Sequence, residues 1–216
     1  MSFTIVAGTS VAIAVTYGTA IAMSALSNAA EAVATLAPAH GVVADDILEI
    51  TSGWPALTGQ LVRVKSVSTN DVTLELINTS DTVQYPAGTG VGSVRKVTGW
   101  TVLGQLDADY STSGGEQQFR ALRLLSQVEE VELPTTRTAT RLQFPYYADP
   151  AAAWVAAVKA SRDSKTVRGI RLSYPNQYIT YGNGLWSMPD FDAPRDGVLG
   201  GDITVNLQAR ANTYAA

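Results

Sequence analysis

Side chains that could bind a metal ion occur at alternate positions in one polar segment, at Asp107, Asp109 and Ser111. This spacing is how an EF-hand calcium loop starts, and such a loop continues with glycine at its sixth position and glutamate at its twelfth. Those two positions hold Thr112 and Gln118 here. The mismatch argues against calcium, so we expect a solvated acidic loop that contacts another protein.

Three pairs of neighbouring carboxylates could supply the general acid and general base of a glycoside hydrolase. The pairs are Asp45-Asp46, Glu129-Glu130 and Asp190 with Asp192. Nothing around them marks a sugar-binding cleft, and acid pairs in loops are usually solvated. A small acidic hydrolase is therefore the less favoured alternative, and we predict no catalytic residue and no enzyme activity.

Histidine and cysteine chemistry is almost absent from the sequence. The chain has one histidine, His40, and no cysteine, which excludes disulfides, cysteine-based zinc sites and thiol catalysis. His40 lies in the turn-like run Pro38-Ala39-His40-Gly41, where we expect its ring to bond to local backbone. The sequence therefore predicts no metal ion and no cofactor.

The composition describes a chain that is poor in charge. Of its 216 residues, 46% are hydrophobic and 16% are charged, whereas about a quarter are charged in average proteins. The formal net charge of −4 at pH 7 predicts no basic patch for nucleic acid. The low charge indicates that much of the surface meets protein rather than water.

The most apolar run of the chain covers residues 11–26. It is shorter than the roughly 20 apolar residues of a membrane helix, and it has no flanking lysine or arginine. We therefore expect no membrane span and interpret this run as buried or interface strand. Residues 3–26 are rich in valine, isoleucine and threonine, which predicts two or three strands.

Residues 31–95 are expected to form a small inserted β module. Five short β-rich segments separated by turn residues cover 31–36, 46–51, 60–67, 71–77 and 93–97. Short strands with tight connections favour a small open barrel. Residues 1–30 and 96–216 would then form one discontinuous core domain.

The second half of the chain predicts strands around a single helix. The expected strands cover 99–106, 117–125, 128–133, 137–147, 167–174, 177–188 and 201–210. Asp149 and Pro150 suit the N-cap and the first helical position. Trp154, Val155 and Val158 follow at helical spacing, so we expect them to anchor the helix to a sheet. The fold class is mainly β, a sandwich or barrel with one flanking helix, and the last six residues are expected to be a polar tail.

The segment between the strands expected at 99–106 and 117–125 is predicted to contact a neighbouring subunit. Its candidate contact residues are Asp107, Asp109, Tyr110, Ser111, Thr112, Ser113, Gly114, Gly115 and Glu116. It is too long for a tight hairpin turn and too polar to pack on its own core. We expect it to be mobile in the free subunit and ordered by a partner.

Several stretches, in their order along the chain, resemble the major tail tube proteins of long-tailed, siphovirus-like bacteriophages. The stretches are His40-Gly41, residues 46–55 (DILEITSGWP), residues 96–100 (KVTGW), residues 111–119 (STSGGEQQF), the helix after Asp149-Pro150 and the end of the chain from Arg210 to Ala216. One departure is Ala44-Asp45-Asp46, where Gly-Asp is more usual in the family.

The resemblance implies a structural virion protein of the tail-tube β-sandwich type. Six copies would form a ring, and stacked rings would form the tail tube around a tape-measure protein, with tail terminator and tail-tip proteins at its ends. The tube would be assembled in the host cytoplasm and later conduct DNA without binding it specifically. The family has no catalytic residues to transfer. The alternative within virions is another β-rich part, such as a tail-tip or adhesion protein.

Overall fold

The computed structural model of the chain describes residues 8–107, 109–123, 125, 129–147, 149–175, 177–190 and 199–216. These residues form fifteen strands and one helix, so the predicted mainly β fold is confirmed. The strands are β1 (Ser10–Tyr17), β2 (Ile21–Leu26), β3 (Val33–Leu36), β4 (Ile47–Ser52), β5 (Leu61–Ser68), β6 (Asp71–Leu74), β7 (Gly92–Val102), β8 (Ser111–Ser113), β9 (Gln117–Leu122), β10 (Val131–Arg137), β11 (Arg141–Tyr147), β12 (Arg168–Ser173), β13 (Tyr178–Ser187), β14 (Gly200–Leu207) and β15 (Asn212–Ala215). The helix, α1, covers Ala153–Ser164.

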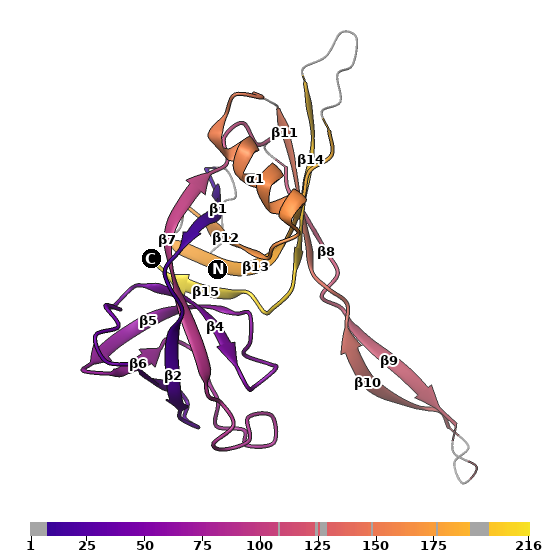
Figure 1. Cartoon of the computed structure of the whole chain (residues 1–216). Helices are drawn as coiled ribbons and strands as arrows, with labels where there is room; N and C mark the ends of the chain where they lie inside the picture. The colour runs from indigo at the N-terminus through magenta and orange to yellow at the C-terminus, as the bar shows by residue number, and fades with distance from the viewer. Residues whose placement is uncertain are drawn as a thin grey trace.

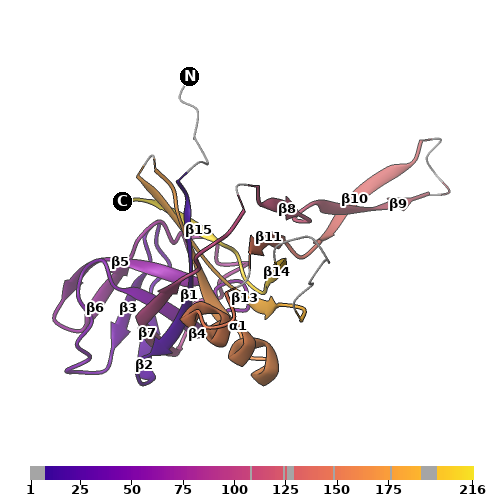
Figure 2. The ribbon, with the colours of Figure 1, turned by 90° about the horizontal axis from the view of Figure 1, so that it is seen from above.

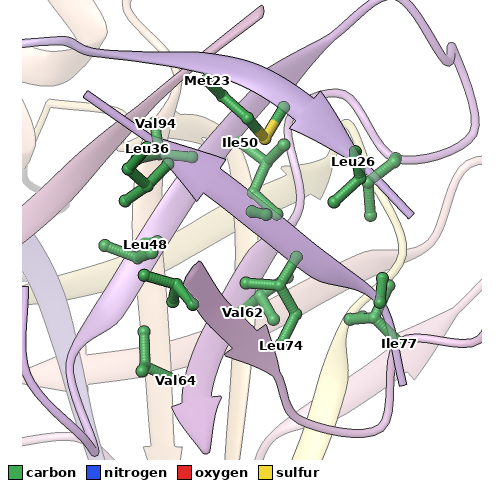
Figure 3. Close-up of a cluster of buried hydrophobic side chains, with 14 of the residues drawn as sticks. Met23, Leu26, Leu36, Leu48, Ile50, Val62, Val64, Leu74, Ile77 and Val94 are labelled. Atoms are coloured by element: carbon green, nitrogen blue, oxygen red, sulfur yellow. The ribbon is translucent and has the colours of Figure 1, made fainter. Parts of the chain in front are cut away.

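Six strands close into a small barrel at one end of the molecule (Figure 1). They are hydrogen-bonded in the order β2-β3-β6-β5-β4-β7, and pairing of β2 with β7 closes the barrel. Its interior is filled by buried apolar side chains, including Met23, Leu48, Val62 and Leu74 (Figure 3). The sequence predicted an open barrel beginning near residue 31, whereas the barrel is closed and also includes β2.

Strand β7 belongs to both halves of the molecule. Its first residues pair with β2 and β4 in the barrel, and residues 97–102 pair with β1 in the other half. A Cβ at Gly92 would collide with the carbonyl oxygen of Thr51, and one at Gly99 would collide with Oγ1 of Thr16. Glycine is therefore required at both positions, because neighbouring strands approach β7 closely there.

The other half of the molecule is a curved sheet folded around a second core (Figure 1). Beyond β7 its strand order is β1-β12-β13-β14-β11-β8, and β15 also pairs with β13. Apolar side chains from β1, β11, β12 and β14 meet inside, including Ile13, Phe144, Ile170 and Ile203. Helix α1 lies against this core, so the predicted arrangement of β strands with one flanking helix is confirmed.

The helix begins later than the sequence predicted. Asp149 does not cap it: its carboxylate accepts the N–H of Ala151 at 3.0 Å, which forms a turn before the helix. The N-cap is Ala152, which makes no side-chain capping bond. The helix ends at Ser164, because Lys165 adopts the left-handed conformation, with φ of 51°.

The end of the chain is a strand and not a polar tail. Residues 212–215 form β15, which pairs with the first half of β13 in the register Ile179 opposite Tyr214. Tyr214 is 1% exposed and belongs to a third core, which also contains Leu61 of the barrel and Tyr181 of the sheet. The C-terminal strand is therefore packed between the two halves of the molecule.

Candidate assembly interface

Strands β9 and β10 form an arm that leaves the body of the molecule. Among the described strands they pair only with each other, and two views at right angles show the pair projecting outward (Figures 1 and 2). The sequence predicted strands at 128–133 and 137–147, but β10 covers Val131–Arg137 and β11 begins at Arg141. Residues 124 and 128, which the predicted strands included, lie outside the described residues.

Apolar side chains of the arm are open to solvent. The exposed fraction is 59% for Phe119, 39% for Val131 and 47% for Leu133. Phe119 lies opposite Pro134 in the register, so it shares a face with Pro134, and Val131 and Leu133 share the other face. An isolated hairpin is marginally stable in water, and uncovered apolar groups on both faces add to its instability. The arm therefore presents uncovered apolar side chains on both of its faces.

The predicted contact segment forms the root of this arm and is not a free loop. Within this segment, Ser111, Thr112 and Ser113 form β8, which pairs with β11. Tyr110 stacks on Phe144 with ring centroids 5.5 Å apart, and its hydroxyl lies 3.4 Å from that of Tyr174. The expectation that the segment cannot pack on its own core is therefore wrong. Ala108 lies outside the described residues.

The connection from β8 to the arm is a tight glycine turn. Gly114 and Gly115 have φ of 78° and 79°, a region that glycine adopts readily. The N–H of Gly115 donates to the carbonyl of Thr138 at 3.1 Å, and the N–H of Thr138 donates to that of Glu116 at 3.0 Å. These bonds join the two strands of the arm to each other at its root. At the other end of the segment, the carboxylate of Asp107 accepts the hydroxyl of Tyr147 at 3.3 Å, while Asp109 is exposed.

The face of β8, β11 and β14 opposite the core is polar and partly to fully exposed. Gln143 lies opposite Ser111 on one side and Thr204 on the other, and Arg141 is placed likewise between Ser113 and Asn206. The guanidinium of Arg141 donates to the side-chain oxygen of Asn206 at 3.0 Å. Among the described strands β8 has β11 as its only neighbour, so this polar sheet ends at an open edge.

The predicted helix anchors lie against the sheet core. Trp154, Val155 and Val158 are 5%, 2% and 0% exposed. The ring of Trp154 meets that of Tyr146 edge-on, with centroids 5.5 Å apart and planes at 86°. This places the apolar stripe of α1 in the same core as the inner side chains of β11 and β14.

Polar bonds join the barrel to the C-terminal strand. The backbone N–H of Arg63 donates to the Tyr214 hydroxyl at 3.2 Å, and the Arg63 guanidinium donates to the carbonyl of Ala215 at 2.6 Å. Arg63 also pairs with Glu75, which lowers the pKa of that carboxyl, because the hydrogen bond favours the charged form. Burial raises the pKa of Tyr214 to about 12, since desolvation disfavours the phenolate.

A second polar bridge crosses between the halves deeper inside. Glu49 of β4 is 9% exposed and accepts the side-chain N–H of Asn183 in β13 at 2.9 Å. The same carboxylate pairs with Arg95 of β7. Sequence reasoning missed this bridge, because alternation alone places Glu49 on a strand without indicating a partner 134 positions away.

The other candidate chemical groups are scattered. His40 lies in its turn as expected, where Nδ1 accepts the N–H of Val42 at 3.0 Å. Asp46 pairs with Lys96 and Glu130 with Arg123, and Asp192 lies outside the described residues. Within the described ranges no group of three or more histidine, cysteine, aspartate or glutamate side chains could hold a metal ion. No helix in that part of the chain is long and apolar enough to cross a membrane.

The chain is a β-rich subunit with an open sheet edge and an uncovered apolar arm, features that are typical of the subunits of structural assemblies. The model of the family described as phage tail tube protein, TTP, matches residues 52–216 of this chain. The chain therefore belongs to the phage tail tube protein family, and the resemblance found in the sequence is confirmed. Its role is structural, as a component of the tail tube of a virion.

Solved structures of contractile injection systems show weak similarity. A chain of the anti-feeding prophage baseplate is 11% identical with a TM-score of 0.40, and the match covers 55% of this chain and 86% of that one. A chain of the PVC sheath–tube complex in its extended state is 17% identical with a TM-score of 0.36, covering 49% and 80%. A chain of the anti-feeding prophage cap is 17% identical with a TM-score of 0.35, covering 49% and 79%. No curated protein matches the chain.

Proposed function

We propose that six copies of this chain form a ring and that rings stack into the tail tube, with the β9–β10 arm of each copy reaching into a neighbouring ring. The observation that carries the proposal is the arm itself, because Phe119 on one face and Val131 and Leu133 on the other have no cover within the described chain. Burial of such groups against another copy supplies a driving force for stacking. The contact residues 107–116 act in this proposal as the root that aims the arm.

Ring closure uses the open edge at β8. An uncovered edge strand pairs readily with a strand of another copy, and a closed ring of strands removes such edges. The polar outward face of β8, β11 and β14 then lines the lumen. The outward positions on these strands carry one cation, Arg141, and one anion, Asp202. A nearly neutral wall lets DNA pass without binding, because phosphate binding requires clustered cations.

The assembled tube is a passive conduit and not an enzyme. It surrounds a tape-measure protein, ends at tail terminator and tail-tip proteins, and is assembled in the host cytoplasm. A tail-tip or adhesion protein would share the β-rich fold but would not polymerise alone into tubes, and this difference separates the two functions.

Electron microscopy of the purified protein at rising concentration tests the proposal. We expect rings and stacked tubes in negative stain. An armless variant is made by joining Gln117 to Arg137, which lie opposite each other at the arm root, through an Asn-Gly turn. This variant should remain folded by circular dichroism and form rings without tubes. Normal tubes from it would refute the role of the arm, and absence of any ring or tube from the intact chain would favour the tail-tip alternative.

A further inference from the structure

A groove of about 430 Å³ lies at the root of the arm. One wall is the segment from Arg137 to Thr140, which connects the end of β10 to β11. The other wall is the connection from β14 to β15, from Leu207 to Ala211. Arg137 and Arg210 are both exposed and line it from opposite walls, and none of the residues lining it is acidic. The groove is therefore a positively charged hollow.

The two arginines have donors to spare. Arg137 donates one N–H to the side chain of Gln117 at 3.3 Å, and a guanidinium carries five N–H groups in all. No ion pair of Arg137 or Arg210 occurs among the described residues. Two guanidinium groups that face one hollow without a carboxylate are suited to an acidic protein segment, because carboxylates accept bidentate bonds from arginine.

The same chain carries such a segment at the far end of its arm. Glu129, Glu130 and Glu132 fall within four consecutive positions and are all exposed. Glu130 is paired within the arm, since its carboxylate lies 3.5 Å from the guanidinium of Arg123. Glu132 lies opposite Ala121 in the register, without a cation across the ladder. Arg120 and Arg123 lie at the same end, so the three glutamates leave it with one net negative charge, while the groove at the root is lined by two arginines and no carboxylate.

We infer that the acidic end of the arm, residues 129–132, docks into the arginine groove at the arm root of a second copy. The contact cannot form within one chain, because the paired strands β9 and β10 hold the acidic end and the groove at opposite ends of the arm. An end-to-root contact between different surfaces is heterologous, and such contacts propagate from copy to copy. The inference rests on the proposed stacking through the arm, and it identifies the arginine groove as the surface that binds the end of the arm.

Charge reversal tests the docking with three variants. Arg210→Glu and Glu132→Arg each place like charges at the contact, and the double variant restores opposite charges in exchanged positions. We expect each single reversal to raise the protein concentration needed for tubes by about tenfold or more, since close interfacial charge pairs are coupled strongly. The double variant should assemble within about threefold of the unchanged chain. Sedimentation of tubes, checked by negative stain, measures the concentration.

Controls separate docking from folding and from stacking in general. Lys65→Glu reverses a charge on the barrel outside the groove and should leave the tube concentration unchanged. Each variant's melting temperature as a free subunit shows that it is folded. If single reversals assemble normally while the armless variant does not, the groove is refuted and stacking through the arm survives. If the double variant is as weak as the single ones, the pairing is refuted. If the armless variant forms normal tubes, the proposed stacking fails together with the groove.

Discussion

Replacing Trp154 by alanine is expected to destabilise the free subunit by about 3–5 kcal/mol, the usual cost of removing a buried tryptophan. The side chain is 5% exposed and belongs to the core that α1 shares with the sheet. Removal leaves a cavity that the surrounding strands can fill only in part, because β11 and β14 are held by their ladder.

The contact geometry places the expected cost in the upper part of that range. The edge-on pair with Tyr146 adds about 0.5–1.5 kcal/mol beyond buried area. For a domain of this length each kcal/mol lowers the melting temperature by about 2–4 °C, so a cost of about 4–5 kcal/mol gives an expected drop of about 8–20 °C. The helix would lose its main attachment near its first turn, where no side chain caps it.

Thermal unfolding of the subunit, followed by circular dichroism at a concentration too low for rings, measures this drop. Phe119→Ala is a matched control, because it also removes an aromatic ring but from a side chain that is 59% exposed. The control should change the melting temperature by less than about 2 °C, since exposed truncations cost little. An unchanged melting temperature for Trp154→Ala, or equal drops for both variants, would show that the helix is not anchored in this way.

Three other predictions concern the lumen, the open edge and the C-terminal strand. Because the chain has no cysteine, Gln143→Cys is a unique label site, and in tubes it should react with a small maleimide but not with a bulky polymer maleimide. Ala160→Cys on the exposed side of the helix should react with both reagents. Equal reaction of Gln143→Cys with the two reagents would contradict a lumenal face. Amides of β8 should exchange faster in the free subunit than in rings, because this strand has a partner on one side only; equal exchange by mass spectrometry would mean that its edge stays open. The Tyr214 pKa of about 12 lies above the unfolded value near 10, so its contribution to stability is present below pH 10 and is lost as pH rises to 12. Tyr214→Phe should therefore remove part of this alkaline loss of stability.

Local patterns predicted the parts of the fold that depend on one element at a time. Leu142, Phe144 and Tyr146 alternate with more polar positions in the strand expected at 137–147, and this apolar face of β11 is inside the core. The spacing of Trp154, Val155 and Val158 likewise identified the buried face of α1. Period alone suffices here because each element has one face toward apolar neighbours, whatever those neighbours are.

Pairing between distant segments could not be predicted in this way. Alternation continues from Arg137 into β11, so one long strand was expected, although the hydrogen-bond partner changes from β9 to β14 across residues 138–140. The arm itself was missed because its residues Phe119, Val131 and Leu133 follow the same alternation as residues of a buried strand. These side chains are uncovered because no second layer of the described chain packs against the arm, and this depends on the whole fold and not on the local pattern.

The barrel contributes to the stability of the rest of the subunit, although its residues were expected to form a separate inserted module. Removal of residues 31–95 would take away Leu61 and Arg63, which cover and hydrogen-bond Tyr214. It would also remove Glu49, which accepts the side-chain N–H of the buried Asn183. An unpaired buried polar group costs about 1–3 kcal/mol, and the exposed aromatic surface adds to that. The barrel can lie outside the tube wall and still be required for a folded subunit, because the C-terminal strand that completes β13 is held from the barrel side.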